Sequence, residues 1–104
     1  MSKFRIPKRF KLLGHTITVK EEPAGVYENN RYGCTSFEGK WIKLTPRSAS
    51  LPVAQSSLEH TFLHELVHMC LYHTEQAKLN ENEDFVDCFA GLLHQALTTM
   101  EYKK

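Results

Sequence analysis

The chain has 104 residues, the length of one small domain, and we therefore expect a single domain over residues 1–104. Hydrophobic residues make up 41% and charged residues 24%, a globular balance that excludes a disordered or collagen-like chain. Thirteen Lys and Arg against twelve Asp and Glu give a net charge of +1. Such a balance argues against a protein that binds nucleic acid or a membrane surface.

The cysteines and the N-terminal segment predict an intracellular protein. Cys34, Cys70 and Cys88 are odd in number and form no CxxC pair. Residues 1–14 have no apolar stretch long enough for a signal peptide, and nothing approaches the ~18 apolar residues of a transmembrane helix. We expect a soluble protein of the reducing cytoplasm.

The first half of the chain alternates polar and apolar residues and predicts two β-hairpins. The four expected strands cover residues 10–13, 16–20, 32–37 and 40–44. Gly14 supplies the turn of the first hairpin, and Glu38 with Gly39 supplies the turn of the second. Residues 46–52, which carry Ser and Pro, predict a loop.

The second half has apolar residues at helical spacing and predicts two amphipathic helices. The first begins at Ser56, which has capping-box spacing to Glu59, and a polar break at residues 74–79 ends it. Asn80 and Glu83 repeat the capping spacing before the second helix. The element order is therefore ββββαα, which is typical of an α+β domain.

An H-E-x-x-H motif lies on the first helix, at His64, Glu65 and His68. Histidines at positions i and i+4 of a helix stand on one face, so both imidazoles can bind one tetrahedral Zn²⁺. The helical period places Glu65 beside the metal rather than on it. A carboxylate there can take a proton from a water that the metal activates and later deliver it to a leaving amine.

A catalytic zinc site usually has three protein ligands, and the second helix offers the third. The metzincin pattern would require a His at position 74, where this chain has Thr74, so it does not fit. Glu83 and Asp87 lie one turn apart on one helix face. Glu83 would bind the metal, and Asp87 would accept the free N–H of a ligating His. An acidic first turn that merely suits the helix dipole is the alternative interpretation.

Together, the run His64-Glu65-Leu66-Val67-His68 and the sequence Asn82-Glu83 followed by Asp87 resemble the gluzincin branch of the zinc metallopeptidases. Among these the chain is similar to the very small versions: the minigluzincins, the ImmA/IrrE-type peptidase domain, and phage or prophage metallopeptidase domains. The resemblance covers about residues 32–97. It implies a zincin-like fold, with about four antiparallel or mixed strands packed against an HExxH helix and a glutamate helix.

The resemblance also implies an activity, that of a zinc-dependent endopeptidase. One Zn²⁺ would be bound by His64, His68 and Glu83, with Glu65 as general base. The peptide substrate would lie extended along strand 40–45 by β-augmentation. Larger gluzincins supply an oxyanion-stabilising side chain from a second subdomain, for which we expect no room here. The conceivable substitutes are Tyr27, Tyr32, His60, Tyr72 and His73.

A second function class keeps the metal and omits the catalysis. In this alternative the chain is a non-catalytic, zinc-stabilised protein-binding or regulatory module of phage or prophage type. The missing oxyanion residue favours it, whereas Glu65 argues against it because a structural zinc needs no general base. A metal-free helical hairpin domain is a third interpretation. If the chain is a latent enzyme, its cleft could be covered by residues 98–104 or by dimerisation.

Several other residues have ordinary structural explanations. We expect His60 at the rim of the site or in solvent, and His94 in a structural or exposed position. Cys70 and Cys88 fall on or beside the helix core faces, where a free cysteine behaves as a small hydrophobe. Trp41 is expected to pack on the sheet.

Overall fold

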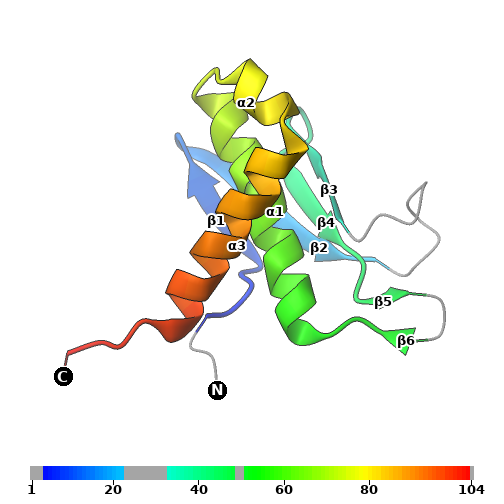
Figure 1. Ribbon diagram of the computed structural model, residues 1–104. Helices are drawn as coiled ribbons and strands as arrows, with labels where there is room; N and C mark the ends of the chain where they lie inside the picture. Colours follow the sequence, from blue (N-terminus) through cyan, green and yellow to red (C-terminus); the bar gives the residue numbers. More distant parts are fainter. Residues whose placement is uncertain (1–3, 23–32, 49–50, 104) are drawn as a thin grey trace.

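The computed structural model describes residues 4–22, 33–48 and 51–103. Within them the strands are β1 (Arg9–Leu12), β2 (His15–Glu21), β3 (Gly33–Ser36), β4 (Trp41–Leu44), β5 (Arg47–Ser48) and β6 (Leu51–Pro52). The helices are α1 (Gln55–His73), α2 (Ala77–Glu81) and α3 (Glu83–Thr99). The fold class is α+β, as predicted, with a four-stranded mixed sheet and three helices (Figure 1). No helix in these ranges is both long and apolar enough to cross a membrane.

Both predicted hairpins form, and together they make the main sheet. β1 pairs with β2 and β3 pairs with β4, each antiparallel. Leu13 and Gly14 join β1 to β2 with φ angles of 48° and 79°, which suit the two-residue turn favoured in hairpins. The two hairpins associate through β2 and β4, which run parallel, so the strand order is β1-β2-β4-β3.

This strand order corrects the expected position of the peptide-binding strand. Residues 40–45 were expected to offer a sheet edge, but β4 pairs with β2 on one side and with β3 on the other. The backbone of Trp41–Leu44 therefore has no free edge. β3 stands at the end of the described sheet instead. Alternating residues predict a strand but not its neighbours, because strand neighbours are chosen by long-range packing.

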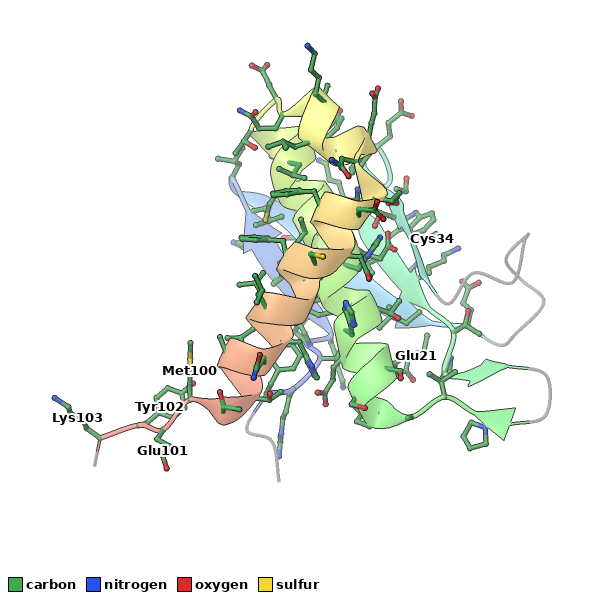
Figure 2. All side chains as sticks on the ribbon, viewed as in Figure 1. Glu21, Cys34, Met100, Glu101, Tyr102 and Lys103 are labelled. Carbon is green, nitrogen blue, oxygen red and sulfur yellow. The ribbon has the colours of Figure 1, made fainter. Side chains whose placement is uncertain are left out.

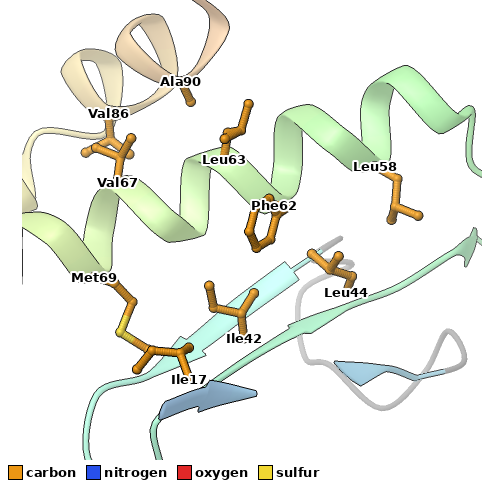
Figure 3. Packing of buried hydrophobic residues seen from close by; sticks show 10 residues of the cluster. All are labelled: Ile17, Ile42, Leu44, Leu58, Phe62, Leu63, Val67, Met69, Val86 and Ala90. Carbon is orange, nitrogen blue, oxygen red and sulfur yellow. The ribbon is translucent and has the colours of Figure 1, made fainter. Parts of the chain in front are cut away.

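The core places α1 between the sheet and α3 (Figure 1). On one side of α1, Leu58, Phe62 and Met69 are buried against Ile17, Ile42 and Leu44 of the sheet (Figure 3). On the other side, Leu63 and Val67 lie against Val86 and Ala90 of α3. Burying each large apolar side chain contributes ~1.5–3 kcal/mol, so α1 is held firmly from both sides.

The predicted capping box at the start of α1 is wrong. The helix begins at Gln55, one residue earlier, and its N-cap residue Ala54 makes no side-chain cap. Glu59 does not reach back to Ser56 but is buried. Its Oε1 lies 2.8 Å from His94 Nε2, and its Oε2 accepts a hydrogen bond of 3.3 Å from Gln55 Nε2. The Glu59 carboxylate therefore contacts His94 of α3 instead of capping the start of α1.

Two segments expected to be irregular contain short elements. The polar break at residues 74–79 overlaps α2, so the chain has a third helix. Asn82 rather than Asn80 caps α3, since its side chain accepts the backbone N–H of Phe85 at 3.0 Å. The loop at residues 46–52 contains β5 and β6, which pair antiparallel with each other.

Two of the cysteines lie at positions other than those expected from the sequence. Cys70 and Cys88 are free and exposed, which corrects their expected position on the core faces. Local desolvation raises the pKa of the Cys70 thiol.

Trp41 is partly buried on β4, and Lys43 Nζ lies 4.4 Å from its ring centroid. Because Ile42 is buried toward α1, its neighbours in the strand point to the other face of the sheet.

Candidate metal centre

Three side chains that the sequence predicts as metal ligands converge between α1 and α3. His64 and His68 come from α1, and Glu83 is the first residue of α3. Glu83 Oε1 lies 2.8 Å from His68 Nε2 and 3.4 Å from His64 Nε2. The ligand atoms of all three residues lie within 4.8 Å of one another. The two helices thus present two imidazoles and one carboxylate to a common point.

Local geometry accounts for this convergence. Residues four apart lie on the same helix face, so His64 and His68 are neighbours along α1. The buried contacts of α1 use its other faces, which leaves both histidines partly exposed. After α1 ends, α2 reverses the chain and α3 returns alongside α1 (Figure 1). Glu83 therefore lies at the level of the histidines as soon as α3 begins.

Oxygen acceptors at Nδ1 orient both imidazole rings. His64 Nδ1 lies 3.2 Å from Asp87 Oδ1, which is the contact that the sequence predicts for Asp87. His68 Nδ1 is hydrogen-bonded to Asn80 Oδ1, a contact that sequence reasoning missed. An acceptor at Nδ1 favours the tautomer with its proton on that atom, so Nε2 keeps a lone pair. Asn80 was interpreted as a helix cap because its spacing to Glu83 suits that role equally well.

The contacts around the rings favour a bound cation. A neutral imidazole has one N–H, but both nitrogens of each ring face oxygens: Nδ1 faces Asn80 or Asp87, and Nε2 faces Glu83. In the neutral form of each ring, one lone pair is therefore directed at a carboxylate oxygen. A metal ion among these atoms would turn this repulsion into coordination.

The donor set fits zinc. Zn–ligand bonds of 2.0–2.2 Å in a tetrahedron separate the ligand atoms by about 3.3 Å. The 3.4 Å between His64 Nε2 and Glu83 Oε1 agrees with that separation, and the 2.8 Å to His68 Nε2 is somewhat shorter. The Glu83 side chain is 61% exposed, so it has room to adjust. Two imidazoles with one carboxylate and an open fourth position are typical of catalytic zinc.

A cleft of about 690 Å³ opens over these residues. Its walls come from β3 with the turn after it on one side and from α1, α2 and α3 on the other. It is lined by Gly33, Cys34, Thr35, Phe37, Ser57, His60, Thr61, His64, Glu65, His68, Asn80, Glu83 and Asp87. Every residue that we predicted as a ligand, base or orienting group thus lies in one cleft.

Glu65 lies in this cleft but outside the three-residue cluster. Its side chain is nearly buried, and its Oε1 accepts a hydrogen bond of 2.6 Å from Thr35 Oγ1 of β3. The Glu65 carboxylate thus shares the cleft with the three-residue cluster without being part of it. Thr35 is a second residue that sequence reasoning missed, because its partner lies 30 residues away.

The five suggested oxyanion-stabilising residues differ in where they lie. Tyr27 and Tyr32 lie outside the described residues. Tyr72 and His73 are described but are not among the residues that line the cleft. Only His60 of the described candidates lines it.

His60 belongs to a polar row along the contact between α1 and α3. Its Nε2 lies 3.3 Å from Asp87 Oδ1 and 3.3 Å from the backbone carbonyl oxygen of Asp87. Its ring stacks on His94 at a centroid distance of 6.4 Å, and His94 contacts buried Glu59. His60 thus lies at the rim of the site and His94 has a structural position, as expected for both.

The C-terminal residues do not cover the cleft. Figure 2 shows Cys34 on β3 beside the cleft, whereas Met100–Lys103 extend from the far end of α3. None of the residues 98–103 lines the cleft, so the suggested C-terminal cover is absent from this part of the described chain.

Comparison with protein-family models, with curated proteins and with solved structures found no match to this chain. A fold alone does not identify an activity. The donor set, the neighbouring carboxylate and the cleft are therefore the features that indicate what the chain does.

Proposed function

We propose that this chain is a zincin-like, gluzincin-type zinc peptidase that hydrolyses peptide bonds in a peptide or protein. The observation that carries this proposal is the convergence of His64, His68 and Glu83 from two helices, with Glu65 beside them in one cleft. A zinc ion, when bound, supplies Lewis acidity that polarises the scissile carbonyl and lowers the pKa of water. The free thiols of Cys70 and Cys88 support a reducing cytoplasm as its location.

The residues of the chain divide the remaining work. Asp87 and Asn80 hold the rings of His64 and His68 with Nε2 toward Glu83. Glu65 accepts a proton from the attacking water as the water oxygen forms a bond to the carbonyl carbon. Glu65 then donates that proton to the amine nitrogen as the C–N bond breaks. One peptide and one water thus become a carboxylic acid and an amine.

An extended peptide is the substrate form that the cleft suits. β3 ends the described sheet, and its residues Gly33, Cys34 and Thr35 line the cleft. An extended peptide in this cleft would lie between the β3 wall and the helices that carry His64, His68 and Glu83. This position replaces strand 40–45, which lies inside the sheet.

One observation favours a second candidate, a zinc-stabilised binding module without catalysis. His60 is the only suggested oxyanion residue that lines the cleft in the described part of the chain, and its Nε2 faces Asp87. An acyl-transfer site without an oxyanion donor loses an important source of rate acceleration. The two candidates share the metal and differ in whether Glu65 acts on a substrate.

The first experiment measures metal content by elemental analysis. We expect one equivalent of zinc in the wild type and a sharp loss in Glu83→Ala. The matched control is Asp84→Ala, an exposed acid in the same helical turn that is not part of the cluster. Equal zinc in both variants would remove Glu83 from the site.

The second experiment tests catalysis on the zinc-loaded protein. Wild type and Glu65→Gln are incubated with a diverse peptide library, and products are identified by mass spectrometry. Loss of the general base should lower the rate ~10²–10⁴-fold while zinc content stays at one equivalent. A folded, zinc-loaded wild type that cleaves nothing would leave the binding module as the better candidate.

A further inference from the structure

Thr35 lies on the face of the sheet that packs against α1, where most strand residues are apolar. In the β3–β4 pairing it stands directly opposite Ile42, which is completely buried. Directly paired residues of antiparallel strands point to the same face, so Thr35 also points toward α1. A partly buried hydroxyl on that face is stabilised by a hydrogen-bond partner. It finds one in Glu65.

β3 approaches α1 very closely at Gly33. A Cβ on Gly33 would lie 2.6 Å from Thr61 Cγ2 and 3.5 Å from Glu65 Cγ. Glycine at that position lets the β3 backbone lie against α1. Two residues further along, the Thr35 hydroxyl donates to Glu65 Oε1 at 2.6 Å. The edge strand that forms one wall of the cleft is thus also the element that holds the carboxylate.

We infer that Thr35 is a positioning residue for the general base. Its hydroxyl holds Oε1 of Glu65, which prevents rotation of the carboxylate and leaves Oε2 for proton transfer. This inference rests on the proposed peptidase function. It adds that β3, which forms one wall of the cleft, also orients the base.

The test compares Thr35→Val with Thr35→Ser. Valine matches threonine in shape but has no hydroxyl, whereas serine keeps it. Misplacing a reacting group by about 1 Å can cost ~10²-fold in rate. We therefore expect Thr35→Val to lower kcat ~10–100-fold with little change in KM, and Thr35→Ser to stay within about 3-fold of wild type. Thr18→Val, the same exchange at an exposed position of β2, is the control.

Crystal structures of the same variants provide a readout that needs no activity. In Thr35→Val the Glu65 carboxylate should leave its position, and in Thr35→Ser it should keep it. A carboxylate that is unmoved in Thr35→Val, or an equal loss of kcat in both variants, would overturn the inference. If Thr35→Val does not fold, Thr35→Ala takes its place. If the wild type cleaves nothing, the proposed function fails, while the structures still decide whether Thr35 holds Glu65.

Discussion

At the residue scale, each imidazole ring of the candidate site has two polar contacts, one at each ring nitrogen. Each histidine has one nitrogen toward Glu83 and the other toward an oxygen acceptor. Such outer contacts set ring orientation and raise ligand basicity. Asn80 therefore has the same orienting role toward His68 as Asp87 has toward His64, although only Asp87 is evident from the motif.

Replacing Asn80 by Ala should weaken zinc binding ~10–100-fold, because the His68 ring then loses its orienting acceptor. Asn80→Asp is the matched variant, since it keeps an oxygen at the same position. Competition with a chromogenic chelator measures both affinities. Equal affinity of Asn80→Ala and wild type would show that the contact with His68 does not support the metal.

At the element scale, the cleft depends on how closely β3 lies against α1. This close approach requires glycine at position 33, since a Cβ there would meet Thr61 Cγ2 at 2.6 Å and the Lys43 carbonyl oxygen at 3.3 Å. The Lys43 oxygen is backbone and cannot easily move aside. The glycine is therefore a packing requirement of the wall that carries Thr35.

Gly33→Ala should destabilise the fold by ~1–3 kcal/mol, the usual cost of overpacking. Gly91→Ala is the control, because a Cβ there meets only the His60 ring, at 3.8 Å from Cε1 and 3.9 Å from Nε2. Alanine also suits a helix interior better than glycine by ~1 kcal/mol. Thermal unfolding measures the stability of both variants, which should fall in Gly33→Ala and rise in Gly91→Ala. Wild-type stability in Gly33→Ala would mean that β3 lies further from α1.

The docking of α3 is the second feature at this scale. Its fully buried apolar residues are Val86 and Ala90, and Phe85, Leu93 and Leu97 are partly buried against the core. Glu83 at its first position links it to both histidines. A metal held by these residues would therefore join the first turn of α3 to α1.

Removing zinc with a chelator should increase amide hydrogen exchange in α3 at least ~10-fold, since local opening then requires no loss of coordination. Amides of β2 and of the middle of α1 serve as the internal control and should change little. Hydrogen exchange read by mass spectrometry gives both. A uniform change along the chain would indicate that zinc affects only global stability.

At the scale of the whole molecule, a chain of 104 residues buries a limited core. Phe62 lies at the centre of that core, with the rings of Phe4 and Phe10 at 6.2 and 5.9 Å. A ligand that binds only the folded state adds to the free energy of unfolding by mass action. Zinc should therefore raise the stability of the entire domain as well as enable chemistry.

At a free zinc concentration 100 times its Kd, the gain is ~2.7 kcal/mol. For a domain of this size that corresponds to a rise in Tm of roughly 10–20 °C. Glu83→Ala should lose the rise, and magnesium should not produce it, because two imidazoles suit zinc rather than a cation that prefers oxygen. Differential scanning calorimetry with each metal measures the shift. A comparable rise in Glu83→Ala would place the zinc elsewhere.

The sequence by itself determined what depends on short-range geometry. Alternation and turn residues predicted both hairpins, and helical periodicity placed His64 with His68 and Glu83 with Asp87, because residues one helical turn apart share a face. Three-dimensional packing decided the rest. The inner position of β4, the Glu59 contact with His94 and the Thr35 contact with Glu65 join residues far apart in the chain. Local patterns carry no information about such partners, which are selected by burial and by the need of each buried polar group for a hydrogen bond.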